Sequence, residues 1–177
     1  MSVKIVLNNV RLSYEHLFAP DGIKGSEPKY SASWIIPKDS PRVEDVRRAL
    51  NQALDEKFPG ARKNGKWPGN KHCPLADGDE LADEHPEYAG SYVLKSSSKV
   101  RPVVYDRRKL PVSAEDGLIY SGCYCNASLA AAGFDAQMKS GVTVYLNGVQ
   151  FVRDGDRLSG YDASNDFEAL DDDEELL

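Results

Sequence analysis

Alternation of apolar and polar residues along short segments is the feature that most constrains the fold of this chain. Residues 29–36 place Tyr30, Ala32, Trp34 and Ile36 on one face. A period of two is typical of a β-strand with one buried face. Similar patterns extend over residues 3–14, 92–95, 99–106, 118–131 and 141–153. The sequence therefore predicts a mainly β protein with five or six strands.

Breaks in this alternation predict bent strands. The phase of the first strand changes at Asn8-Asn9, and Gly122 interrupts a later one. Ser96-Ser97-Ser98 predicts a turn that pairs residues 92–95 with residues 99–106. Several bent strands separated by Gly and Pro favour a small barrel, and an OB-like barrel is a common nucleic-acid-binding version. We therefore expect an OB-like barrel.

One α-helix is predicted at about residues 41–57, inserted after the second strand. Ser40 suits the N-cap, and Pro41 suits the first helical position, where no N–H is needed. Apolar residues then recur at spacings of three and four, as on the buried face of a helix: Val43, Val46, Ala49, Leu50, Ala53 and Leu54. Residues 60–90 show no periodicity, which predicts a long central loop, basic first and acidic later.

The C-terminal segment differs from the rest in charge. Residues 162–177 hold eight of the 28 acidic residues and no Lys, Arg or His, so residues 1–161 carry 22 basic and 20 acidic side chains. Runs of like charge stay disordered and often act as interaction tails. We expect one domain, residues 1–161, and a disordered acidic tail. That tail is either a solubility segment or a nucleic-acid mimic that occupies the protein's own binding groove.

Basic and aromatic residues gather in the central loop and on the middle strands. Single-stranded nucleic acid is bound by such mixtures, since cations follow the phosphates and aromatic rings stack on unpaired bases. The stacking candidates are Trp34, Trp67, Tyr105 and Tyr124, and the phosphate-binding candidates are Lys63, Lys66, Lys95, Lys99, Arg101 and Arg107. The alternative is that the charges are ordinary surface residues and that Trp34, Tyr105 and Tyr120 belong to the core.

Nothing in the sequence predicts catalysis. The phosphate-binding loop, nucleophile-elbow, zinc-protease and dinucleotide-binding motifs do not occur. His72-Cys73 and Cys123-x-Cys125 could supply metal ligands, but no Cys-x-x-Cys pair accompanies them. The acids of the central loop lack a partner motif for magnesium chemistry: Asp77, Asp79, Asp83 and Glu84. We expect no enzymatic activity, no metal and no cofactor.

Sequence features also predict the compartment. No segment approaches about 18 uninterrupted apolar residues, and no signal-peptide core follows Met1. Three cysteines, an odd and sparse number, suggest free thiols in a reducing compartment. We therefore expect no membrane contact and a cytoplasmic location.

Several segments resemble a known family. They are residues 10–14 (VRLSY), 17–20 (LFAP), 28–38 (PKYSASWIIPK), 120–128 (YSGCYCNAS), 141–142 (GV) and 146–155 (LNGVQFVRDG). These segments resemble the phage-encoded single-stranded DNA-binding proteins with an OB-fold and an acidic C-terminal tail, a family first catalogued as a domain of unknown function.

The resemblance implies sequence-independent binding of single-stranded DNA during phage replication or recombination, in the cytoplasm of the host cell. It also implies that the tail contacts other replication or recombination proteins, and a homodimer is compatible with it. The partner-binding residues would be Asp171, Asp172, Asp173, Glu174, Glu175, Leu176 and Leu177. The alternative function is an acidic DNA mimic or protein-interaction module that inhibits a basic nucleic-acid-binding partner, although a body near +2 argues against it.

Overall fold

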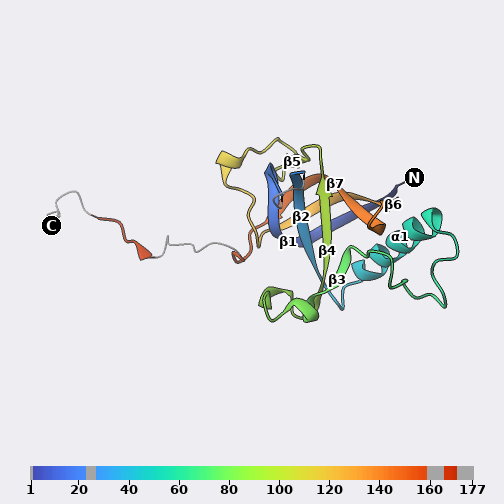
Figure 1. Cartoon of the computed structure of the whole chain (residues 1–177). Coiled ribbons are helices and arrows are strands. Elements are labelled where there is room, and N and C mark those ends of the chain that lie inside the picture. Colours follow the sequence, from blue (N-terminus) through green and yellow to red (C-terminus); the bar gives the residue numbers. More distant parts are fainter. Residues whose placement is uncertain (1, 23–26, 159–165, 171–177) are drawn as a thin grey trace.

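A computed structural model describes residues 2–22, 27–158 and 166–170 of the chain. Figure 1 shows a mainly β body with one helix at its side. The elements in chain order are β1 (Val3–Asp21), β2 (Lys29–Pro37), α1 (Arg42–Lys57), β3 (Leu75–Asp77), β4 (Ser91–Ser98), β5 (Val103–Tyr105), β6 (Tyr124–Asp135) and β7 (Ser140–Arg153).

Five of these strands close into a barrel. The sheet order is β3-β4-β2-β1-β6-β7-β5, and an additional parallel pairing joins β4 to β7 at Ser97 and Tyr145. This pairing closes the ring β1-β2-β4-β7-β6, while β3 and β5 extend the sheet outside the ring. The expected OB-like barrel is confirmed.

Bulges bend the long first strand, as the sequence predicts at Asn8-Asn9. The register of β1 against β6 shifts between Leu7 and Val10, and Asn9 adopts a φ of 55°. Asn tolerates this left-handed conformation better than most residues do. The side chain of Asn126 accepts a hydrogen bond from the backbone N–H of Asn9, at 3.0 Å. β1 pairs with β6 from Val3 to Arg11 and with β2 from Arg11 to Asp21.

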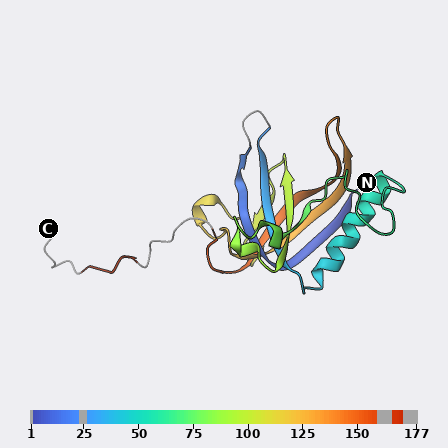
Figure 2. The ribbon, with the colours of Figure 1, turned by 60° about the horizontal axis from the view of Figure 1, so that its bottom comes forward.

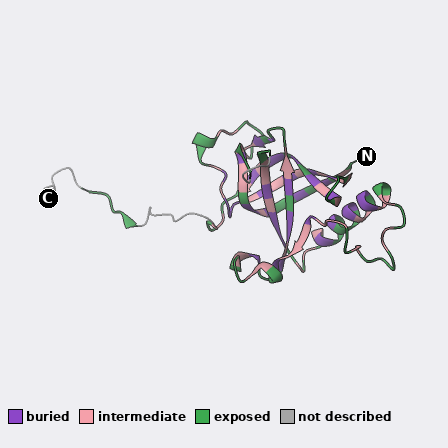
Figure 3. Cartoon of the chain, in the orientation of Figure 1, coloured by how far each residue is buried: buried purple, intermediate pink, exposed green. Residues whose placement is uncertain are grey.

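The core fills the barrel and continues under α1. The helix begins at Arg42, and its N-cap is Pro41 rather than the expected Ser40. Ser40 Oγ nevertheless accepts a hydrogen bond from the backbone N–H of Arg42. The apolar face of the helix, with Val46, Leu50 and Leu54 fully buried, packs mainly against β6 and β1. Figure 3 shows this buried stripe facing the sheet and the exposed stripe facing outward. The predicted helix is confirmed.

Two predictions about the middle of the chain are wrong. Ser96, Ser97 and Ser98 belong to β4 rather than to a turn, and β5 pairs in parallel with β7 rather than with β4. The central segment also contains β3 and short 3₁₀ helices at Gly78–Leu81 and Pro86–Tyr88. A run of three serines fits this strand because Ser96 is buried and hydrogen-bonded to the carbonyl oxygen of Ala32, while Ser97 faces the polar outer side.

The predicted disordered tail, residues 162–177, lies outside the described residues except for residues 166–170, and residues 159–161 before it are not described either. Within the described part of the chain, no helix has the length and apolar character needed to cross a membrane.

Trp34 is a core residue, so the prediction that it stacks on DNA bases is wrong. It is 0% exposed, and its Nε1–H donates a hydrogen bond to Ser96 Oγ at 3.1 Å. Ser96 in turn donates to the carbonyl oxygen of Ala32 at 2.7 Å. A side chain enclosed in this way cannot meet a ligand without unfolding of the barrel.

We expect Trp34→Ala to lower the free energy of unfolding by about 3–5 kcal/mol, since it leaves a large cavity and removes a buried hydrogen bond. Urea denaturation monitored by circular dichroism measures this change. Met138→Ala, at a residue that is 96% exposed, is the control and should change stability by less than about 0.5 kcal/mol. A change below about 1 kcal/mol for Trp34→Ala would contradict its assignment to the core.

Candidate nucleic-acid interface

A cleft of about 1050 Å³ lies on the outer face of the barrel. Its walls are the β1–β2 hairpin and the β6–β7 hairpin, and its floor is the outward face of β2 and β4. Figure 2 shows the two hairpins on either side of β4. OB-folds bind oligonucleotides on the face of their second and third strands, between the corresponding loops. The cleft therefore occupies the position where this fold binds nucleic acid.

The floor of the cleft is polar because strand alternation sends every second residue outward. On β2 these residues are Lys29, Ser31 and Ser33, and on β4 they include Lys95 and Ser97. Ser31 lies opposite Ser97, and Ser33 lies opposite Lys95. Small hydroxyl side chains let a ligand approach the strands closely and offer hydrogen bonds to it. The floor thus suits a polar, extended ligand.

Four lysines make the cleft cationic: Lys29, Lys95, Lys99 and Lys139, all exposed. Two of them act on His72, whose pKa is lowered first by partial burial and then by the positive charges of Lys139 and Lys95. Lys99 also pairs with Glu27 at 3.2 Å, an exposed contact that a polyanion could replace. The electrostatics favour an anionic ligand.

Aromatic rings stand beside these cations. Tyr14 and Tyr145 line the cleft with 42% and 46% of their surface exposed. Phe134 lines the opposite wall, and its ring meets that of His72 edge-on, with centroids 6.3 Å apart. Exposed rings among lysines are the combination that binds unpaired bases and phosphates together.

The predicted site residues separate into several groups. Lys95 and Lys99 lie in the cleft, and Trp34 lies in the core. Lys63, Lys66 and Trp67 lie in the segment after α1, around an open hollow of about 600 Å³. Trp67 is partly buried, and its Nε1–H donates to the carbonyl oxygen of Lys71 at 2.9 Å.

The segment that carries Lys63 and Lys66 joins the β6–β7 wall of the cleft. His72 donates its backbone N–H to the carbonyl oxygen of Ser140 at 2.8 Å, and Lys71 Nζ donates to Ser140 Oγ at 2.9 Å. The basic hollow therefore adjoins the cleft rather than forming a remote patch.

The other predicted DNA-binding residues do not line the cleft. Arg101 and Tyr105 border a hollow beside β5, and Arg107 donates to the carbonyl oxygen of Val152 at 2.9 Å. Tyr124 is partly buried, and the guanidinium of Arg153 lies 3.6 Å from its ring centroid. A cation already covers one face of that ring, which leaves Tyr124 less free to stack on a base.

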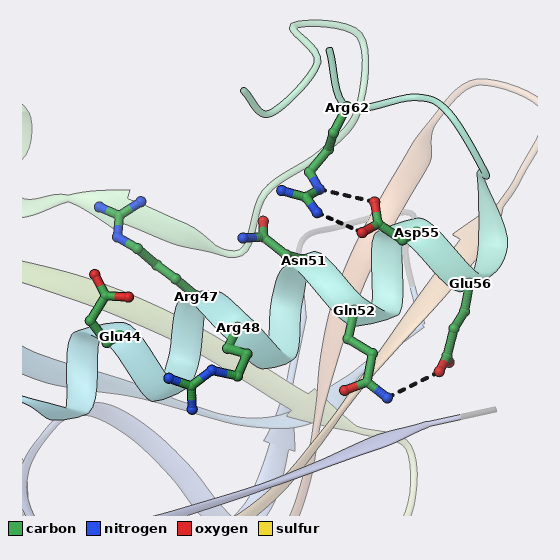
Figure 4. Close-up of a pocket in the computed structure, with 8 residues that line it drawn as sticks. All are labelled: Glu44, Arg47, Arg48, Asn51, Gln52, Asp55, Glu56 and Arg62. Atoms are coloured by element: carbon green, nitrogen blue, oxygen red, sulfur yellow. Dashed lines mark hydrogen bonds and ion pairs between the residues drawn. The ribbon is translucent and has the colours of Figure 1, made fainter. Parts of the chain in front are cut away.

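Another hollow, on the outer side of α1, has a different character. Figure 4 shows its basic and acidic side chains side by side. Arg62 donates two hydrogen bonds to Asp55, at 2.6 and 2.9 Å, and Arg48 pairs with Asp45 at 3.3 Å. Because its cations are balanced by acids, this surface does not select a polyanion.

Residue chemistry in the described part of the chain gives no metal centre. No group of three or more His, Cys, Asp or Glu side chains is placed to hold an ion there. The thiols of Cys123 and Cys125 are buried with their sulfurs 3.6 Å apart. Asp77 and Asp79 both pair with Lys38, at 2.7 and 2.6 Å. The hydrogen bond from Lys38 lowers the pKa of the Asp77 carboxyl, whereas the backbone N–H of Gly90 first, and Lys38 second, lower the pKa of the Asp79 carboxyl.

Several residues that line the cleft are not among the DNA-binding residues predicted from the sequence: Tyr14, Lys29, His72, Phe134, Lys139 and Tyr145. Lys29 could have been found, because it shares the outward phase of the second strand with Ser31 and Ser33. The others depend on how the two hairpins face each other across the barrel, which no local pattern encodes.

The fold and the site together define an OB-fold protein with a cationic, aromatic cleft. The sequence matches the family described as the Enterobacter phage Enc34 ssDNA-binding protein over residues 3–177, and the chain belongs to this family. It is 39% identical over 165 residues to putative protein p50 of Acyrthosiphon pisum secondary endosymbiont phage 1, covering 89% of this chain and 88% of the relative.

Solved structures agree with this assignment. The single-stranded DNA-binding protein from bacteriophage Enc34 in complex with ssDNA superposes with a TM-score of 0.76 and 25% identity, covering 88% of this chain and 89% of that chain. The single-stranded DNA-binding protein gp2.5 of bacteriophage T7 superposes with a TM-score of 0.62 over 100% of both chains. At 15% identity the latter similarity concerns the fold alone.

We expect His72 to make the stability of the protein sensitive to pH. Its pKa is lowered in the folded chain, so below about pH 6.5 the unfolded chain binds a proton at His72 that the folded chain resists. Stability should therefore fall as the pH drops through this range. His72→Gln should retain more of its stability at about pH 5.5, relative to about pH 7.5, than the unchanged protein does. Identical pH dependence in urea unfolding of the two proteins would contradict this account.

Proposed function

We propose that the protein binds single-stranded DNA in the cleft, without sequence preference and without catalysing a reaction. The observation that carries this proposal is the cationic, aromatic cleft at the oligonucleotide-binding position of an OB-fold. Family membership and the similarity to a protein solved in complex with ssDNA support it. The proposed setting is DNA replication or recombination of a phage, in the cytoplasm of the host cell.

The chemistry of the cleft accounts for a lack of sequence preference. The side chains of Lys29, Lys95, Lys99 and Lys139 reach phosphates, which every nucleotide carries. The exposed ring of Tyr145 offers a stacking surface, and every base has a face that can stack. Ser31 and Ser97 can donate or accept hydrogen bonds with sugar and phosphate oxygens alike.

The basic hollow beside the β6–β7 wall extends this surface. In the proposed complex a strand that leaves the cleft past Lys139 passes onto Lys71, Lys66 and Lys63, with Trp67 beneath them. The hydrogen bonds of Lys71 and His72 to Ser140 hold the two surfaces together. Arg101, Tyr105, Arg107 and Tyr124 remain predicted contacts for a strand longer than the cleft.

The acidic tail is proposed to regulate access to the same cleft. Its acids resemble a row of phosphates, and tethering gives them a high local concentration near the lysines. DNA that enters the cleft would release the tail, and Asp171–Leu177 would then be available to replication or recombination proteins. Leu176 and Leu177 provide an apolar contact for such a partner. This contact adds to the binding energy of the acids, because exposed ion pairs contribute only about 0–1 kcal/mol each.

We expect Lys95→Gln to weaken binding to a polythymidine strand and to make it less sensitive to salt. Removal of one phosphate contact should reduce the slope of log affinity against log salt by about 0.7. Quenching of tryptophan fluorescence at several salt concentrations measures both quantities. Lys4→Gln, a charge-matched change on β1 outside the cleft, should leave the slope unchanged. Equal slopes for all three proteins would exclude Lys95 from the interface, and absence of any salt-sensitive binding would exclude the proposed function.

We expect deletion of residues 162–177 to tighten binding to single-stranded DNA, because a competing polyanion is removed. The gain should shrink as salt increases, since salt screens the competition. Gel-shift titration at low and high salt measures this gain.

Replacing Leu176 and Leu177 with Ser retains the tail's charge, so DNA affinity should stay unchanged while capture of phage replication proteins weakens. A loss of DNA affinity on either change would contradict the proposed competition between the tail and DNA. Failure of both the full chain and the shortened chain to bind DNA would favour the DNA-mimic alternative.

A further inference from the structure

Tyr14 has a backbone conformation that a bulky residue rarely adopts. Its φ is 47°, and it lies where the register of β1 against β2 shifts between Ser13 and His16. Left-handed backbone is unfavourable for residues with a large side chain, and such positions persist only where the surroundings enforce them. Bulges of this kind often redirect a side chain next to a functional site.

The redirected side chain faces the cleft. Ser13 is fully buried, whereas Tyr14 exposes 42% of its surface and lines the cleft near Ser31 and Ser33. The interrupted pairing between Ser13 and His16 thus brings an aromatic ring to the β1–β2 wall. Tyr14 is not among the buried residues of the core, so burial of its ring does not account for the strained backbone.

A set of contacts holds the ring of Tyr14 in place. Its hydroxyl lies 2.7 Å from His85 Nδ1 and 3.4 Å from Glu87 Oε1. The ring meets that of His85 edge-on, with centroids 5.2 Å apart, and that of Tyr88 at 6.3 Å. Tyr88 is itself buried, and its hydroxyl lies 2.8 Å from Ser13 Oγ. The brace around Tyr14 is therefore anchored in the core.

We propose that Tyr14 is a base-stacking platform of the cleft and that His85 is the positioning residue that presets its ring. This inference rests on the proposed DNA binding and assigns a role to the central segment around residues 85–88, which otherwise lacks one. A ring already fixed loses little conformational entropy when a base stacks on it, so the brace increases affinity without touching DNA.

The test compares Tyr14→Asn, His85→Ala and the double variant on two strands of equal length, polythymidine and an abasic strand. Asn tolerates the left-handed backbone, so the ring is removed without adding strain. Tyr14→Asn should lower affinity for polythymidine about 5- to 150-fold, the range of one lost stack. It should not change affinity for the abasic strand or the salt slope, because no phosphate contact is lost.

His85→Ala should cause a smaller loss on polythymidine and none in the Tyr14→Asn background, since its effect passes through the ring. Thermal melting of each variant verifies that it is folded. Equal losses on both strands would mean that Tyr14 acts only on the shape of the cleft, and this would overturn the proposal. An additive effect of His85→Ala would overturn its positioning role. If the unchanged protein and Lys95→Gln behave as expected but Tyr14→Asn binds normally, this inference fails while the proposed function stands.

Discussion

Closure of the barrel between β4 and β7 is the constraint on which both the core and the cleft depend. The two strands run in parallel and meet at Ser97 and Tyr145. Both residues also line the cleft, so the contact that completes the barrel is part of the proposed binding face. Without it, the sheet would connect the β6–β7 hairpin to the floor of β2 and β4 only through β1. The cleft is therefore a consequence of closure rather than a separate addition to the fold.

Neighbouring residues of the same strands divide between core and surface. On β2, Trp34 is buried while Ser33 faces the cleft, and on β4, Ser96 is buried while Lys95 and Ser97 face outward. The buried hydrogen bond between Trp34 and Ser96 links these two strands from inside. Rigidity of the floor thus comes from side chains that never touch a ligand, and a rigid floor places the lysines at fixed spacing.

The architecture could be predicted from the sequence because it depends on local patterns. Alternation located most strands, the three- and four-residue spacing located α1, and the phase change at Asn8-Asn9 located a bulge. The site could be predicted only in part. Charge alone indicates Lys95, which lines the cleft and remains a predicted contact, whereas Trp34 is misassigned because an aromatic residue fits a core and a stacking site equally well. Burial decides between these roles, and burial depends on which strand covers the residue.

Tyr14 and Phe134 were missed for a different reason. Each lies on one hairpin, and they line the same cleft only because barrel closure sets the two hairpins opposite each other. The bulge at Tyr14 cannot be recognised in the sequence either, because a tyrosine that continues the alternation of a strand predicts regular extended backbone. Contacts between residues far apart in the chain, such as Tyr14 with His85, therefore carry the information that local patterns lack.

Net charge is a poor guide to the ligand of this protein, and the distribution of charge explains why. The chain carries −6 overall, which would suggest repulsion of DNA. However, exposed charges separated by more than about 10 Å are largely screened at 0.1 M salt. A strand in the cleft therefore senses Lys29, Lys95, Lys99 and Lys139 before it senses distant acids. The acidic residues beyond Tyr161 can oppose DNA only when they come close to these lysines. In the proposed competition, charge separation along the chain thus makes inhibition depend on the position of the tail, which a uniformly acidic protein could not achieve.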